Sequence, residues 1–450
     1  MEFLNLILSL ILFYTISSQI IYEFKRDFEL NEGMSEEQIF LKLAYNDLYT
    51  FIRIGTPERE LKVGITFEEK SLVLLGSNIK NREIFNELAS DSYKYISDVF
   101  IMPDAFQMTE AVIGEEIINL NNINQRYKIK FLLAKNIENT SLEYNNYEPL
   151  YFSGYMGLSI SNNYNQQDFP ESLPVYLNEN YKQNFKSSFT MKFNIKETGN
   201  YNGKLIMNEY PHEYDKKNYN IKQYKTIRLQ SYDNYDDWCI SLDNTYYGND
   251  IIFDSSTIIF RAEYGIILAP SKFMEYLYDI YFKKYMNICD YKGVKLMGAS
   301  QKFYVCKKEL DIKAFKDIKI EVKERNFNFT LSYDNLFYEY NNKYYFLIVS
   351  GSSSMNNVFT VGSVLMKKYD FVFDKYNSNI GFYDKSIEIK EDPDHTFIIY
   401  ISIISVLAVL IILVIIYLIW KYMNKPRISR KNELNDEYNY VSGPISDDTK

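Results

Sequence analysis

This sequence predicts a mainly β fold, and three observations support that prediction. The chain has 450 residues, of which 43 are tyrosine and 31 are phenylalanine, and aromatic and β-branched residues favour strands. Its apolar runs are separated by polar residues that are typical of turns. In residues 48–65, a run of strand formers leads into a turn at Gly55-Thr56-Pro57 and then into the alternating Leu61, Val63 and Ile65. This segment is predicted to be a β-hairpin.

Composition and charge limit the classes of function. The formal net charge of -9 argues against a nucleic-acid partner, because binding phosphates requires a basic surface. The two histidines are His212 and His395, and His395 adjoins a long apolar segment. His212 is then the sole candidate base for a Ser-His or Cys-His hydrolase, and a lone histidine is more often a surface or turn residue. We predict no cofactor.

The three cysteines, Cys239, Cys289 and Cys306, are too few and too widely spaced for a zinc site, so no metal is predicted. Cys289 and Cys306 lie in a segment that could fold back on itself, and in a secreted chain we expect them to form one disulfide. Cys239 is then an odd, buried thiol.

The N-terminus has the features of a signal peptide. Residues 3–15 are apolar, and Thr15-Ile16-Ser17 has the small-x-small pattern that signal peptidase accepts, so cleavage is expected after Ser17. Glu2 departs from the pattern, because the region before the apolar core is normally basic. An uncleaved anchor is the alternative. Residues 18–47 then form an N-terminal segment before the main fold.

Residues 397–420 carry no charge, and as a helix they would be about 36 Å long, enough to cross a bilayer. Basic residues follow and acidic residues precede the segment, so residues 421–450 are predicted to be a cytosolic tail. We therefore expect a single-pass type I membrane protein of the secretory pathway, at the cell surface or in endolysosomes. The sequons at Asn139 and Asn328 fall in the predicted lumenal part and are candidate glycosylation sites.

Three segments resemble the pepsin-like aspartic protease family. YTFIRIGTPERELKVGITFEEKSLVLLGS, from Tyr49, is similar to the family's first active-site hairpin, and FSGYMGL at 152–158 is similar to the strand that backs the first catalytic loop. FTVGSVLMKKYDFVFD at 359–374, followed by NIGF, resembles the family's closing signature. Three such matches in the family's order are not plausibly coincidence.

The resemblance covers residues 48–384 and implies two β lobes with a cleft between them. We expect the N-terminal lobe at 48–222 and the C-terminal lobe at 223–388, with residues 238–242 opening the second lobe. The Cys289 and Cys306 pair matches the disulfide that is usual in that lobe.

An aspartic protease holds a water between two carboxylates that share one proton. Counting from the IGTP turn, Thr66-Phe67-Glu68 replaces the first Asp-Thr-Gly triplet. Counting back from Pro270, Arg261-Ala262-Glu263 replaces the second. A rival register places Asp254 at the second position, but it lies too close to Trp238 and too far from Pro270. In either register the pair of carboxylates is missing.

Other features of the predicted site are degenerate too. Glu68 and Glu263 stand where glycines keep the cleft floor open, and Phe67 and Ala262 replace the hydroxyls that cross-link the loops. No Tyr-Gly pair occurs where the flap is expected. Asp104 or Phe106 stands near the place of the flap tyrosine.

Two functions are compatible with this pattern. The first is a non-catalytic ectodomain that binds a peptide, a protein or another surface ligand, in which Arg261 forms salt bridges with Glu68, Glu69 and Glu263. The second is an active membrane-anchored aspartic endopeptidase, with Glu68 or Glu69 supplying one carboxylate and Glu263 the other. A glutamate displaced by two residues along a tight loop would not point at the same spot, which favours the first function.

Overall fold

The computed structural model describes most of the chain between residues 19 and 424. The described ranges are 19–26, 28–79, 83–99, 108–120, 125–137, 152–160, 169–181, 185–194, 202–232, 235–296, 299–351, 357–387 and 395–424. The chain divides into one unit that ends at Ile387 and a second that begins at Glu388. The first unit is mainly β, as the sequence predicts.

The N-terminal half of the first unit contains a closed six-stranded barrel, which is part of a 13-stranded sheet. Its strands pair in the order β2, β3, β8, β4, β7 and β6, and β6 pairs back with β2. They are β2 (Leu48–Ile54), β3 (Arg59–Thr66), β8 (Gly154–Gly157), β4 (Leu72–Leu75), β7 (Arg126–Ile137) and β6 (Met108–Asn119). The predicted hairpin at 48–65 is confirmed by the antiparallel pairing of β2 with β3.

The rest of the 13-stranded sheet joins segments that are distant in the sequence. β5 (Lys94–Val99) extends the barrel beyond β6, and the other strands continue the sheet from β2 in the order β1, β10, β9, β25, β26 and β11. These are β1 (Ile20–Arg26), β10 (Asn202–Met207), β9 (Ser188–Asn194), β25 (Val372–Asp374), β26 (Asn379–Tyr383) and β11 (Tyr224–Arg228). The last strands of the unit thus pair beside strands from its first half.

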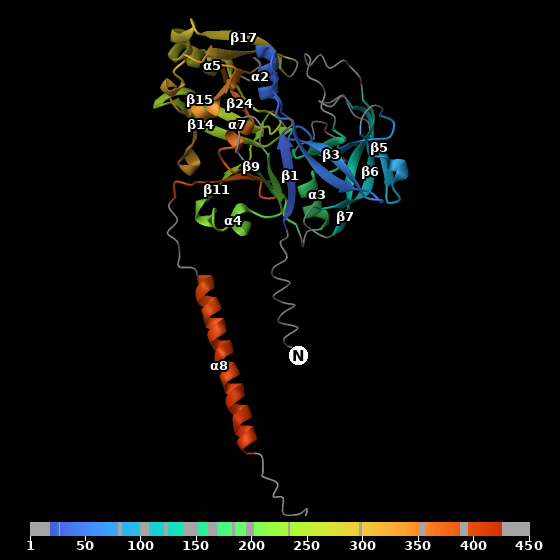
Figure 1. The fold of residues 1–450 in the computed structure, drawn as a ribbon. Coiled ribbons are helices and arrows are strands. Elements are labelled where there is room, and N and C mark those ends of the chain that lie inside the picture. Colours follow the sequence, from blue (N-terminus) through green and yellow to red (C-terminus); the bar gives the residue numbers. More distant parts are fainter. Residues whose placement is uncertain are drawn as a thin grey trace, which may run out of the picture. The chain divides into compact units, whose positions relative to one another are not determined.

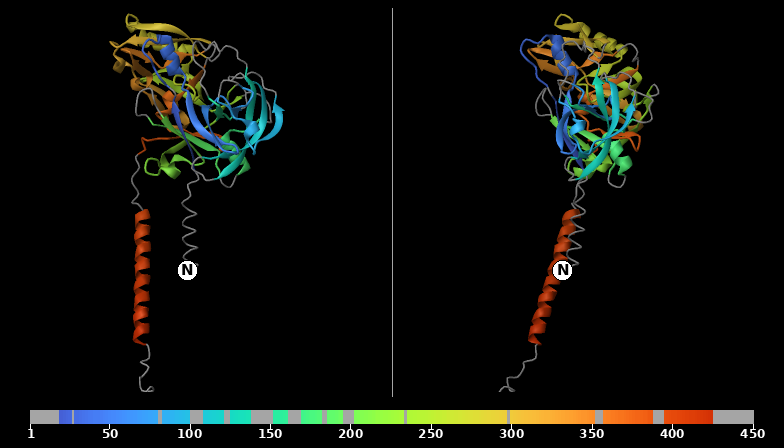
Figure 2. Two further views of the ribbon diagram at one scale, coloured as in Figure 1. Left: turned by 45° about the vertical axis from the view of Figure 1, so that its right-hand side comes forward. Right: turned by 90° about the vertical axis from the view of Figure 1, so that its right-hand side faces the viewer.

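The residues between β11 and β25 form two further sheets and a small ribbon, β12 (Ser231–Tyr232) with β13 (Tyr235–Asp236). The seven-stranded sheet comprises β14 (Cys239–Tyr247), β15 (Asp250–Phe260), β16 (Ile267–Ala269), β19 (Ile318–Val322), β20 (Phe327–Leu331), β23 (Ile348–Ser350) and β24 (Val358–Val361). The four-stranded sheet comprises β17 (Cys289–Leu296), β18 (Ala299–Lys307), β21 (Phe337–Tyr340) and β22 (Lys343–Phe346). Figures 1 and 2 show these sheets on one side of the unit and β5, β6 and β7 on the other.

Both halves of the unit repeat one pattern of strand pairing. In the barrel, β3 pairs parallel with β8, β8 antiparallel with β4, and β4 parallel with β7. In the seven-stranded sheet, β15 pairs parallel with β24, β24 antiparallel with β16, and β16 parallel with β23. Parallel pairs inside mostly antiparallel sheets are specific enough that their repetition in the same order relates β3 to β15 and β8 to β24.

Short helices pack around the sheets. They are α2 (Glu36–Ala44), α3 (Leu173–Asn180), α4 (Pro211–Tyr214), α5 (Ser271–Ile280), α6 (Tyr333–Leu336) and α7 (Ser363–Met366). α2 begins at a capping box in which Ser35 and Gln38 bond each other's backbone amides. Its apolar face packs against Tyr264, Ile266 and Leu268 of the second half. The N-terminal segment therefore contacts the loop that precedes β16.

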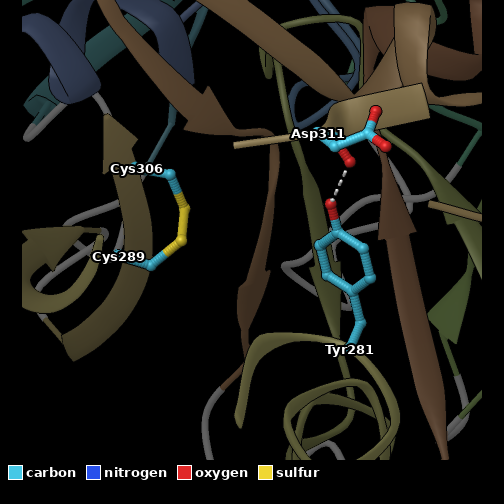
Figure 3. Close-up of a disulfide and its surroundings, with 4 residues drawn as sticks. All are labelled: Tyr281, Cys289, Cys306 and Asp311. Atoms are coloured by element: carbon cyan, nitrogen blue, oxygen red, sulfur yellow. Dashed lines mark hydrogen bonds between the residues drawn. A yellow bond between two sulfur atoms is a disulfide. The ribbon is translucent and has the colours of Figure 1, made fainter. Parts of the chain in front are cut away.

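The disulfide predicted from the sequence is confirmed. Cys289 and Cys306 face each other across β17 and β18 and are bonded, with a Cα–Cα distance of 4.0 Å (Figure 3). Nearby, the Tyr281 hydroxyl at the end of α5 donates to the Asp311 carbonyl at 3.0 Å. Cys239 is buried and free.

The second unit contains α8 (His395–Met423), a single helix of 29 residues (Figure 1). Its side chains are described at positions 405, 407 and 409–423. Taking only the described residues, no helix combines the length and the apolarity that a membrane crossing requires. The transmembrane assignment of 397–420 stays a prediction.

Candidate functional site

Two backbone loops occupy equivalent places in the repeated pattern: residues 66–71 at the end of β3 and residues 261–266 after β15. The amide of Gly157, at the end of β8, donates to the Ser71 carbonyl at 3.1 Å, and the amide of Gly362, after β24, donates to the Ile266 carbonyl at 3.1 Å. A Cβ atom at Gly157 would lie 2.4 Å from the Ser71 oxygen, and one at Gly362 would lie 1.9 Å from the Tyr264 oxygen. Neither position can accept a side chain without movement of the loop.

This equivalence relates the residues of the two loops. Thr66 and Arg261 stand at the same distance along the chain before Ser71 and Ile266. Thr66 is the last residue of β3, and Arg261 directly follows the last residue of β15. The triplet at 66–68 therefore corresponds to the triplet at 261–263. Asp254 lies inside β15, exposed, opposite Asn244 of β14. Arg261, and not Asp254, thus occupies the counterpart of the Thr66 position.

The Arg261 guanidinium group is held by a carboxylate next to the buried Trp238. Its Nη1 donates to Oδ1 of Asp237 at 2.7 Å, and its Nη2 donates to Oδ2 of the same group. This two-point arrangement is the strongest geometry for such a pair. Burial by itself would lower the pKa of Arg261, but the charge and hydrogen bonds of Asp237 outweigh burial and raise it. The counterpart of the Thr66 position in the second half therefore carries a fixed positive charge.

The backbone of one residue of the first loop, Phe67, is bound at both its amide and its carbonyl by the second loop. Nη1 of Arg261 donates to the Phe67 carbonyl at 3.2 Å, and Oε2 of Glu263 accepts from the Phe67 amide at 3.0 Å. Oε1 of Glu263 lies 3.7 Å from Nε of Arg261. The two side chains form a clamp on Phe67 and cross-link the loops without hydroxyl groups.

Glu263 lies in an environment that disfavours its charge. Burial, followed by the nearby negative charge of Glu68, raises the pKa of Glu263 to about 8. Arg261 and the Phe67 amide act in the opposite direction and do not compensate fully. The Glu263 carboxyl group is consequently protonated over most of the neutral and acidic range.

The Glu68 side chain is directed to Tyr264. The Tyr264 hydroxyl donates to Oε1 of Glu68 at 2.6 Å, and burial together with Glu68 and Glu263 raises the pKa of Tyr264. The amide of Glu68 donates to Oγ1 of Thr66 at 3.0 Å. The Thr66 hydroxyl therefore bonds inside its own loop.

Below the loops lies a continuous aromatic core. Phe67 is fully buried, and its ring centroid lies 5.7 Å from that of Phe189 and 5.0 Å from that of Phe373, both edge-on. Trp238 packs on the same two rings, and its Nε1 donates to the Leu158 carbonyl at 2.7 Å. Each edge-on pair contributes on the order of 0.5–1.5 kcal/mol beyond simple burial. Phe67 thus anchors the first loop to the core.

The N-terminal segment also holds the second loop. The Asn46 side-chain amide donates to the Ala262 carbonyl at 2.8 Å, and the Asn46 backbone amide donates to the Glu263 carbonyl at 2.7 Å. Sequence reasoning missed both Asn46 and Asp237. The place of Asp237 directly before Trp238 was a weak signal in the sequence. Nothing in the sequence marked Asn46, which lies 216 positions from Ala262.

The remaining predicted site residues divide into two groups. Asp104, Phe106 and Asn139 lie outside the described residues. Asn328 is exposed on β20, as a glycosylation site requires. Glu69 is buried and is not part of the ion pairs described for Arg261. Within the described ranges, no three His, Cys, Asp or Glu side chains are arranged to hold a metal ion.

The cluster of Arg261, Asp237, Glu263, Glu68 and Tyr264 can therefore bind two loops together, but it lacks two facing carboxylates at the equivalent positions. Comparison with known proteins adds no identification, since no protein-family model and no curated protein matches the sequence.

Proposed function

We propose that this chain is a membrane-anchored, non-catalytic protein with the two-lobed fold of the pepsin-like aspartic proteases, and that its ectodomain binds a peptide, a protein or another surface ligand. The repeated strand pattern, the closed barrel and the glycines that abut each loop support the fold. The three segments that resemble the family fall on β2 to β4, on β8, and on β24 to β26. The uncharged residues 397–420 support the anchor.

One observation supports the proposed lack of catalytic activity. At the two equivalent positions, where a shared proton must lie between carboxylates, the chain has Thr66 and the ion-paired Arg261. A hydroxyl group cannot act as a general base near neutral pH, and a guanidinium group can neither give up nor accept a proton there. The loops are instead joined by the clamp on Phe67.

A peptide-cleavage assay tests this proposal. The full-length chain in detergent is incubated with a diverse peptide library from pH 3 to pH 7, and the products are identified by mass spectrometry. We expect no cleavage above that of a sample heat-inactivated beforehand. Specific cleavage that is blocked by a transition-state inhibitor of aspartic proteases would refute the proposal.

An active endopeptidase is the second candidate, because the raised pKa of Glu263 beside Glu68 resembles the environment of a general acid. If these carboxyl groups performed the reaction, Glu263→Gln and Glu68→Gln would each abolish cleavage. Glu60→Gln, which alters an exposed residue of β3, serves as the matched control. Activity lost in the first two variants and kept in the third would establish this candidate.

A further inference from the structure

His212 lies in a cluster of tyrosines at the end of the 13-stranded sheet, away from the two loops in sequence and in strand order. It belongs to α4, and its ring and its backbone both contact the hydroxyl of Tyr383, the last residue of β26. Nδ1 lies 2.7 Å from the Tyr383 oxygen, and the His212 backbone amide donates to the same oxygen at 3.2 Å.

These two contacts fit best a hydrogen bond in which the Tyr383 hydroxyl donates to Nδ1 of the ring. The phenol oxygen already accepts the backbone amide, and the phenol proton needs an acceptor. Nδ1 of a neutral imidazole is such an acceptor, whereas a protonated Nδ1 is a donor. The arrangement therefore fits neutral His212 with its proton on Nε2. Protonation would direct two N–H groups at one oxygen, and the described contacts show no other acceptor for the phenol proton.

Some of the groups that surround His212 raise its pKa, and others lower it. Tyr210 stacks on the ring at 5.5 Å, and the Tyr224 ring lies 5.3 Å away. Glu213 attracts a proton to His212, and Lys186, which is paired with Glu213 at 2.7 Å, repels one. Burial is the largest effect, and the net result is a lowered pKa of His212.

The same segment covers the end of the first unit. Tyr219 packs with Val372 and Tyr383, and its hydroxyl donates to Asp370 at 2.7 Å. Gln223 bonds the Asp384 amide through its carbonyl and the Ile387 carbonyl through its side chain, each at 2.9 Å. Residues 210–224 are thus attached to the strand and turn that end the unit at Ile387.

We propose that His212 and Tyr383 form a pH-sensitive latch, which holds residues 210–224 on β26 when His212 is neutral and loosens them when His212 is protonated. Because the folded-state pKa lies below the unfolded value, the unfolded or opened state binds more protons near pH 6. The stabilisation by the latch is then present above the ordinary histidine pKa of about 6.5 and is lost as the pH falls through the folded value. This inference does not depend on the proposed function.

Amide hydrogen exchange of the full-length chain in detergent, followed by mass spectrometry, tests the latch. Peptides from 210–224 and 379–383 should lose several-fold protection between pH 7.5 and pH 5, after correction for the intrinsic exchange rate. Peptides from β17 and β18, which the disulfide joins, are the internal control and should keep theirs. In His212→Asn, whose side-chain oxygen can still accept the phenol proton, the loss at pH 5 should disappear.

A second measurement does not require that this variant fold well. The chain has two histidines, so the His212 ring signals can be followed by NMR, with the His395→Gln chain identifying them. The midpoint should lie below about 6.5 and should rise in Tyr383→Phe, which removes the donor to Nδ1. A midpoint at or above the ordinary value, or equal loss of protection in the wild type and in His212→Asn, would overturn the latch.

Discussion

Arg261 and Asp237 form a two-point ion pair, with Nη1 and Oδ1 2.7 Å apart, at the position that corresponds to Thr66 in the repeated strand pattern. The pair is mostly shielded from water, with side-chain exposures of 17% and 12%. Removing one partner of such a pair leaves a buried charge, which costs more than the pair itself contributes. The contribution of this ion pair to stability can therefore be measured by removing one partner.

Asp237→Asn should lower the free energy of unfolding by about 3 kcal/mol, because Arg261 would stay charged without its partner. Adding Arg261→Met should recover much of this loss, since the double variant has no uncompensated charge. Denaturant unfolding of the three chains measures the effect. The exposed pair of Arg53 and Glu60, 3.3 Å apart, is the control, and Glu60→Gln should cost at most about 1 kcal/mol. Equal costs at the two sites would contradict the structural role of Asp237.

Glu263 should make the protein less stable as the pH rises. Its pKa is raised to about 8 in the folded state, against about 4.3 for an ordinary glutamate. The unfolded chain therefore releases this proton first, and the favourable contribution present below about pH 4 is lost progressively up to pH 8. Glu263→Gln removes this dependence and should gain stability relative to the wild type between pH 5 and pH 8.5. Parallel curves for the two chains would show that Glu263 does not titrate in this way.

The Cys239 thiol should be unreactive in the folded protein. It is buried, and burial raises its pKa to about 12, so almost no thiolate is present at neutral pH. A maleimide should label one cysteine in denaturant without reductant and three after reduction, but none in the native chain. Labelling of the native chain at the rate seen in denaturant would refute the burial of Cys239.

Two carboxylates alone should not create a protease. In the Thr66→Asp, Arg261→Asp chain, Asp237 loses its cation, and the side chains of Glu68 and Glu263 still fill the space between the loops. A six-site chain that restores Asp-Thr-Gly in both loops is the minimum expected to cleave an acid-pH peptide substrate measurably. It should also be less stable by about 3–5 kcal/mol, because Phe67→Thr removes a buried ring. Turnover by the two-site chain equal to that of the six-site chain would show that the neighbouring residues do not matter.

The tail after Lys421 should be cytosolic, and Asn139 and Asn328 lumenal. A C-terminal tag on the chain made in sealed microsomes should be digested by added protease, whereas the part up to Ile387 should be protected. Glycosylation at Asn328 should disappear in Asn328→Gln and persist in Asn326→Gln, which alters the neighbouring left-handed turn residue and not the sequon. A protected tag would mean that the orientation is reversed.

The sequence by itself determined the mainly β class, the hairpin at 48–65, the disulfide of Cys289 with Cys306, and the lack of aspartate at Thr66. Each of these depends on residue identity, or on spacing along a short stretch of chain, and such patterns can be read without coordinates. The sequence also indicated that Arg261 would need an anionic partner.

Only the tertiary structure decided which partner that is. Asp237 lies 24 positions from Arg261, Phe67 lies 196 positions from Glu263, and Asn46 lies 216 positions from Ala262. Sequence reasoning chose Glu68, Glu69 and Glu263 as partners, and it found the Glu263 contact but not the stronger one. Contacts of this kind form when distant strands pair and fold two loops together, so their geometry follows from the packing of the whole unit and not from the local pattern.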